Sequence, residues 1–172
     1  MSKSNNKIIF PQVEEGYIPF RMDLYNQSYV SGDKNSESLR VNYYFRKSDK
    51  HVIAHAWFGP KAEGPPNHAH GGSIAAVLDE TMGATPWANY ISVVAATIKI
   101  HFKKMLPLGI IATVDCWIEK IEGRKVWTKG KITDGDGKVF SEGEGLYIIL
   151  PIEKFENIPA EAIEKFKNFN YA

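Results

Sequence analysis

The sequence is poor in the features that mark several classes of protein. Its single cysteine, Cys116, excludes an internal disulfide and favours a reducing compartment. No stretch approaches the roughly eighteen consecutive apolar residues of a membrane span. The first residues, MSKSNNKIIFPQ, lack the apolar run that a signal peptide needs. We therefore expect a cytoplasmic protein that does not associate with a membrane.

A surplus of charge of one sign is also absent. The 21 lysines and arginines against 20 aspartates and glutamates leave a net charge of +1. No global field would therefore recruit a nucleic acid, and an anionic ligand must be met by local groups. The sequence has no internal repeat, and its length suits one domain that buries about 70% of the surface of its unfolded chain.

The order of β-type and helical segments predicts an α+β architecture. The runs LRVNYYFRK (39–47) and HVIAHAWFG (51–59) are rich in β-branched and aromatic residues and predict a hairpin. Four more β-type runs follow at 92–105, 110–121, 125–133 and 138–150. The turn signals LPLG, EGR and DGDG between them predict consecutive antiparallel neighbours. With one helix between the two groups, we expect an antiparallel sheet of about six strands packed on a single central helix.

The central helix is predicted from residue 71 to about residue 87. Apolar residues recur there every three or four positions and form a stripe of Ile74, Val77, Leu78, Thr81 and Met82. A second stripe consists of small residues and one acid: Gly72, Ala75, Ala76, Asp79 and Gly83. Small side chains would let a ligand or another backbone approach this second face closely.

The start of this helix and one of its acids predict complementary chemistry. Gly71 and Gly72 open the helix, where unpaired N–H groups lie at the positive end of the helix dipole and stabilise an oxyanion. A carboxylate on a mostly buried helix is costly unless it is hydrogen-bonded or functional. By helix phase Asp79 shares the small-residue face and Glu80 does not. We therefore predict that Asp79 is a nucleophile or a general base.

The distance along the helix predicts a dimer. Gly71 and Asp79 lie eight positions apart, which is about 12 Å at about 1.5 Å per residue. An oxyanion donor and an attacking group must both lie about 3 Å from one carbonyl. A twofold dimer that places the amide end of one helix near the aspartate of the other resolves this conflict. No metal site is predicted, because His68 and His70 have no evident third ligand.

The motif HGGSIAAVLDETMG, residues 70–83, resembles the hotdog-fold acyl-CoA thioesterases of the PaaI and THEM-like kind. The order of strands and helix is similar over residues 39–150. The resemblance implies a hotdog thioesterase domain over 39–150. Residues 1–38 end in a cluster of turn formers and are expected to be an irregular lead-in, and Pro159 in IPAEAIEKFKNF predicts a short helix in the tail over 151–172. The resemblance also implies homodimers whose two sheets run on from one another, or a dimer of dimers.

The resemblance further implies hydrolysis of acyl-CoA to free coenzyme A and a carboxylic acid. Asp79 would be the nucleophile or general base, and the Gly71 N–H would polarise the thioester carbonyl. His70 would orient the loop or the thioester, Thr97 would position water or the acid, and Asn67 would assist.

The substrate itself brings the coenzyme A, so no separate cofactor is expected. The phosphates of coenzyme A need cationic partners. Together with Gly72, the residues expected to bind substrate are Lys103, Lys104, Arg124 and Lys125.

Two alternatives follow from the same residues. One is a hotdog hydratase or dehydratase, although these enzymes tend to use a histidine with a carboxylate on a different pattern. The other is a non-catalytic module that binds acyl-CoA, against which the presence of Asp79 argues. The sequence leaves open the acyl chain, the choice between coenzyme A and a carrier-protein thioester, and the choice between dimer and tetramer.

Overall fold

The computed structural model describes residues 8–20, 28–156, 158 and 160–167. Three strands precede the main helix: β1 (Tyr17–Phe20), β2 (Leu39–Arg46) and β3 (His51–Phe58). After helix α1 (Gly71–Ala88) come β4 (Val93–Phe102), β5 (Ile111–Glu122), β6 (Lys125–Thr133) and β7 (Val139–Ile149). Short 3-10 helices lie at Pro60–Ala62 (η1) and Ile152–Lys154 (η2), and helix α2 spans Ala160–Lys167.

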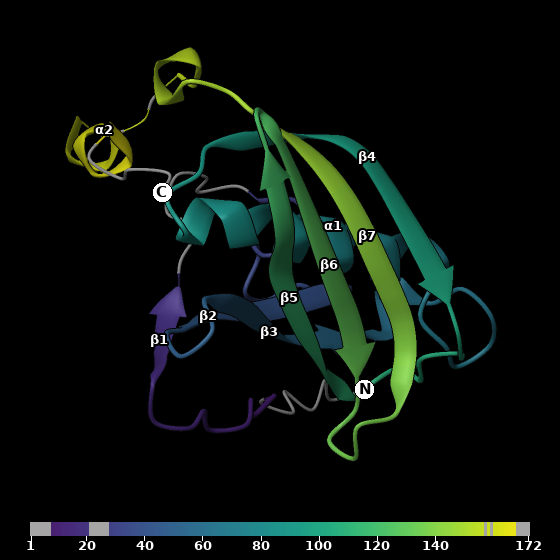
Figure 1. Cartoon of the computed structure of the whole chain (residues 1–172). Helices are drawn as coiled ribbons and strands as arrows, with labels where there is room; N and C mark the ends of the chain where they lie inside the picture. Colours follow the sequence, from purple (N-terminus) through teal and green to yellow (C-terminus); the bar gives the residue numbers. More distant parts are fainter. Residues whose placement is uncertain (1–7, 21–27, 157, 159, 168–172) are drawn as a thin grey trace.

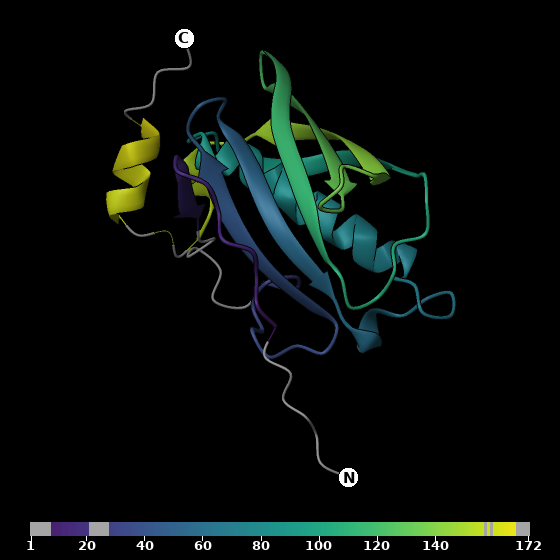
Figure 2. The same cartoon turned by 90° about the horizontal axis from the view of Figure 1, so that it is seen from below.

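The described strands form one antiparallel sheet in the order β1-β2-β3-β5-β6-β7-β4. The sheet curves around α1, as Figures 1 and 2 show from two directions. This confirms the predicted α+β architecture with one long central helix. The sheet has seven strands instead of about six because β1, in the predicted lead-in, pairs with β2.

The prediction that the runs 92–105 and 110–121 are neighbours in the sheet is wrong. β4 pairs with β7, and β5 pairs with β3. The connection 103–110 is not a tight turn, since Ala69 donates to the Leu106 carbonyl at 2.8 Å and Gly109 donates to the Phe58 carbonyl at 2.8 Å. Residues 103–110, held by these bonds, run from β4 at one edge of the sheet to β5 in its middle. β4 is therefore an edge strand, paired only with β7 among the described residues.

The apolar stripe of α1 packs against the concave face of the sheet. Ile74 is 3% exposed, and Val77, Leu78, Thr81 and Met82 are fully buried, which confirms the predicted helical phase. Each large apolar side chain buried in this way contributes about 1.5–3 kcal/mol. The small-residue stripe is only partly covered by the chain's own sheet.

The predicted C-terminal helix is confirmed as α2, which lies on the side of the molecule opposite β4 (Figure 1). In the described part of the chain, no helix combines the length and the hydropathy needed to cross a membrane.

Candidate active site

Helix α1 begins with a histidine cap that leaves one amide unused. His70 is the N-cap residue, with extended backbone angles of φ −62° and ψ 138°. Its Nδ1 accepts the Gly72 N–H at 2.9 Å, and its carbonyl accepts the N–H groups of Ser73 and Ile74 at 3.0 and 3.2 Å. No described residue accepts the Gly71 N–H. This donor is therefore available at the positive end of the helix.

An apolar ring lies beside the free amide. Phe102, the last residue of β4, lies 3.3 Å from the point where a Cβ of Gly71 would be, and its side chain is 56% exposed. A Cβ on Gly72 would lie 2.9 Å from His70 Nδ1, so the capping bond leaves no room for a larger residue. The start of α1 is therefore flanked by the exposed Phe102 ring and leaves no room for a side chain at Gly72.

Asp79 lies half-buried two turns further along α1. The Tyr147 hydroxyl on β7 donates to the Asp79 carbonyl at 3.1 Å and lies 3.4 Å from its Oδ1. Burial raises the pKa of the Asp79 carboxyl, the Tyr147 hydrogen bond opposes this rise, and the charge of Glu80 adds to it. A carboxylate that is poorly solvated when ionised is suited to attack or to proton transfer.

Glu80 points to a different side of the helix and is held by hydroxyl groups. Its Oε1 accepts from Ser31 Oγ at 2.8 Å and from Tyr43 Oη at 2.5 Å, and its Oε2 accepts from Ser28 Oγ. These bonds fasten residues 28–31 and β2 to α1. The predicted separation of Asp79 and Glu80 on different faces is confirmed, and the structure gives Glu80 a role in holding elements together.

The amide and the carboxylate do not meet within one chain. The helix is continuous over Gly71–Ala88, so the estimated separation of about 12 Å between Gly71 and Asp79 holds.

Thr97 lies on the outer face of the sheet. A bulge separates Ala95, which is opposite Tyr147, from Thr97, which is opposite Leu146. Residues that lie opposite each other on antiparallel strands share a face of the sheet. Tyr147 faces the helix, so Ala95 does too, whereas Leu146 and Thr97 lie on the other face. Thr97 lines an outer cavity of about 210 Å³ together with Leu146 and Trp127. One chain does not bring Thr97 to Asp79, and its role stays a prediction.

Asn67 lies in the exposed loop before the helix. Its φ of 62° is left-handed, a conformation that asparagine tolerates better than most residues. Its backbone N–H donates to Glu63 Oε1 at 2.7 Å, and its carbonyl accepts from Leu108 at 3.0 Å. The structure therefore gives Asn67 a part in shaping the loop, and its catalytic role stays a prediction.

The four predicted cations form two pairs at opposite ends of β4. Lys103 follows β4 directly and pairs with Glu142 at 2.9 Å, with Lys104 beside it. Arg124 donates to the Ile149 carbonyl at 3.2 Å, and Lys125 lies opposite Ile148.

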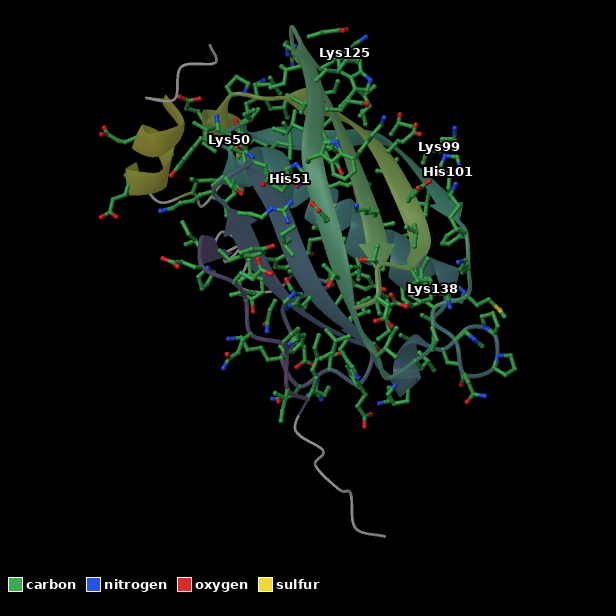
Figure 3. The ribbon with its side chains drawn as sticks, turned by 60° about the horizontal axis from the view of Figure 1, so that its bottom comes forward. Lys50, His51, Lys99, His101, Lys125 and Lys138 are labelled. Atoms are coloured by element: carbon green, nitrogen blue, oxygen red, sulfur yellow. The ribbon has the colours of Figure 1, made fainter. Side chains whose placement is uncertain are left out.

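Figure 3 labels one lysine toward each end of the sheet. Lys125 lies at one end of the sheet, and Lys138, near the end of β4, lies at the other. β4 pairs with residues 141–149, eight residue steps that span about 26 Å at about 3.3 Å per residue. One chain does not bring the two pairs together.

Tyr147 is the candidate that the sequence did not reveal. Its signal is the alternation along β7, which places Gly143, Gly145 and Tyr147 on the side that faces the helix. The two glycines have no side chain, so they leave room on this face of the sheet for the large polar ring of Tyr147. Among the described residues, no group of three or more histidine, cysteine, aspartate or glutamate side chains is arranged to hold a metal ion.

Comparisons with known proteins identify relatives of this chain. Residues 66–141 match the model of the thioesterase superfamily. Acyl-coenzyme A thioesterase THEM4 of Xenopus laevis is 33% identical over 119 residues, which are 69% of this chain and 54% of the relative. The chain spans about half the length of the curated relatives it matches.

Solved structures show the same fold. The crystal structure of a thioesterase superfamily protein has a TM-score of 0.61 at 27% identity, over 63% of this chain and 56% of that chain. A hypothetical thioesterase protein of Streptococcus pneumoniae, solved with coenzyme A, has a TM-score of 0.57 at 17% identity, over 59% of this chain and 80% of that chain. These matches confirm the resemblance seen in the sequence: residues 66–141 are a domain of the thioesterase superfamily, built on the hotdog fold.

Proposed function

We propose that the protein hydrolyses acyl-CoA thioesters to coenzyme A and a carboxylic acid, as a homodimer with composite active sites. One observation carries the proposal: an amide at the helix start, with no acceptor among the described residues, and a half-buried carboxylate lie on one helix, too far apart to reach one carbonyl. The names of the relatives, acyl-coenzyme A thioesterases, and the structural neighbour solved with coenzyme A support this choice of substrate.

The free edge of β4 supports the dimer. This strand of 10 residues pairs only with β7 among the described residues, and Ile98 and Phe102 on it are 39% and 56% exposed. A long apolar edge is a template for pairing with another chain. We infer that two copies of β4 pair antiparallel and extend the sheet across a twofold axis.

The register of this pairing follows from the two half-sites. Phe102 lies beside Gly71, and Ala95 lies opposite Tyr147, which bonds to Asp79. A twofold axis that crosses β4 midway between residues 95 and 102 would bring the Gly71 amide of one chain toward the Asp79 carboxylate of the other. The same pairing would place the end of β4 that carries Lys103 and Lys104 near the Arg124 and Lys125 end of the second chain, where the phosphates of coenzyme A would bind.

The reaction follows from these positions. The Gly71 N–H of one chain donates to the thioester oxygen and stabilises the negative charge that develops there. Asp79 of the other chain attacks the carbonyl carbon, or removes a proton from a water that attacks it. The carbon–sulfur bond breaks, the thiolate of coenzyme A takes up a proton, and the acyl group leaves as the acid. If Asp79 attacks directly, water hydrolyses the resulting anhydride.

The remaining predicted residues act around this centre. His70 fixes the Gly71 amide by capping the helix through Nδ1. Gly72 keeps the entrance free of a side chain. Thr97 and Asn67 stay predictions for positioning water and the thioester.

Release of free thiol from a panel of aliphatic and aromatic acyl-CoA esters tests the proposal. Asp79→Asn is expected to lower kcat by about 10²–10⁴-fold. Glu80→Gln, a matched change on the neighbouring residue, is expected to keep near-wild-type turnover because Ser31 and Tyr43 hold Glu80 away from the site.

Two results would contradict the proposal. A wild type that binds every ester and hydrolyses none would be an acyl-CoA-binding module. Full activity in Asp79→Asn with loss in Glu80→Gln would show that Glu80, and not Asp79, is the catalytic carboxylate.

A further inference from the structure

We propose that Tyr147 is a positioning residue for Asp79, holding its carboxylate in the orientation and ionised form used in the reaction. This inference rests on the catalytic role of Asp79 given under the proposed function.

The contact joins two different elements. Tyr147 Oη on β7 donates to the Asp79 carbonyl at 3.1 Å, and the same hydroxyl lies 3.4 Å from Asp79 Oδ1 on α1. The ring is 2% exposed, so its position is fixed by packing. Burial and the nearby Asp79 charge raise the pKa of the Tyr147 hydroxyl. It therefore stays protonated and keeps donating over the working range of an enzyme.

Small residues on each side make room for the ring. A Cβ on Gly145 would lie 2.5 Å from Tyr147 Cε2, so any larger residue there would force the ring to move. A Cβ on Gly83, one turn after Asp79, would lie 3.4 Å from Tyr147 Cε1 and 3.7 Å from its hydroxyl. The residue across the strand pair is Ala95. The fold thus provides a slot between sheet and helix that a tyrosine fills with its hydroxyl at the carboxylate.

The charges around Asp79 make this hydroxyl important. From its own helix Glu80 raises the pKa of Asp79, as does burial, which is the largest cause. From β5 the Cys116 thiol lies near Tyr147, and burial raises the pKa of Cys116 so that it stays neutral. Among the groups of the described chain that act on Asp79, the Tyr147 hydroxyl is the one that lowers its pKa. Removing the hydroxyl therefore raises the pKa of Asp79 and moves the acid limb of activity to higher pH.

Tyr147→Phe in the full-length protein removes the hydroxyl and keeps the ring. The same hydroxyl donates to the Asp79 carbonyl and its contact with Oδ1 is 3.4 Å, so loss of this weak hydrogen bond predicts a kcat lower by roughly 2- to 10-fold with little change in KM. The acid limb of the kcat profile is expected to move to higher pH.

Tyr43→Phe is the matched control, because it removes a tyrosine hydroxyl from the neighbouring Glu80. It is expected to lower thermal stability and to leave the acid limb in place. An equal shift of the acid limb in both variants would overturn the proposal.

A titration that needs no turnover separates this inference from the proposed function. Carbon-13 NMR of the Asp79 carboxyl, assigned with Asp79→Asn, reads its pKa in the wild type and in Tyr147→Phe. Equal pKa values in the two proteins would overturn the role of Tyr147 even if kcat falls. A shifted pKa in a protein without thioesterase activity would instead overturn the proposed function alone.

A second variant covers the case in which Tyr147→Phe does not fold. Incorporation of 3-fluorotyrosine at position 147 keeps ring and hydroxyl and makes the hydroxyl a stronger donor. The Asp79 pKa is then expected to fall, and an unchanged value would overturn the proposal.

Discussion

Replacing Gly71 with proline removes one backbone N–H, the proposed oxyanion donor, and is compatible with the start of helix α1. Proline has no N–H and is favoured at the first position of a helix, which Gly71 occupies. The preceding His70 has φ −62° and ψ 138°, the extended conformation that a residue before proline adopts. Gly71→Pro is therefore expected to fold and to lack only the proposed oxyanion donor.

Gly71→Ala is its control. Both substitutions place a carbon about where a Cβ would lie 3.3 Å from Phe102, whose exposed ring can move aside. Only the alanine keeps the N–H.

The magnitude follows from the loss of one preorganised donor. Such a loss costs about 10²–10³-fold in kcat, or about 2.7–4 kcal/mol of transition-state stabilisation. Gly71→Ala is expected to stay within about tenfold of the wild type, or about 1.4 kcal/mol. Thiol release at saturating acyl-CoA measures both, and circular dichroism checks that the helix is retained. Equal losses in the two variants, or an active Gly71→Pro, would refute the reasoning.

Two further predictions concern assembly and stability. Ile98→Lys on the free edge of β4 is expected to convert dimers to monomers and to abolish activity, as measured by light scattering and thiol release. Ile121→Lys, at a similarly exposed isoleucine on β5, is expected to do neither, and a monomeric wild type would contradict the composite site. Asp79→Asn is expected to raise the melting temperature at neutral pH. Folding raises the pKa of Asp79, so its ionised form opposes folding above that pKa, and the advantage of asparagine should fade as the pH falls through it.

Local features of the fold were predictable from the sequence. The helix was expected from residue 71 to about 87 and spans Gly71–Ala88, because its burial repeats with the helical period within one segment. The predicted tight turns at EGR and DGDG are confirmed, since Gly123 and Gly137 have left-handed φ angles of 57° and 80°. These signals depend only on neighbours in the chain.

Long-range arrangements were not predictable in the same way. The place of β4 beside β7 depends on the crossing of residues 103–110, where LPLG predicts a turn between neighbouring strands but the chain instead runs to the middle of the sheet. The bulge between Ala95 and Thr97 decides which of them lies on the side of the helix, and alternation alone does not reveal a bulge. Tyr147 on Asp79 and Tyr43 on Glu80 are contacts between distant segments. The sequence does not indicate these contacts, because they form only when the sheet packs β7 and β2 against the helix.

The composite active site is tested most directly by mixing two inactive variants. Asp79→Asn and Gly71→Pro are refolded together in equal amounts, and thiol release is compared with that of each variant alone. If each site takes its amide from one chain and its carboxylate from the other, about half of the dimers are mixed and each holds one intact site, which restores about a quarter of wild-type activity. A mixture no more active than the separate variants would contradict the composite site, because amide and carboxylate would then belong to the same chain.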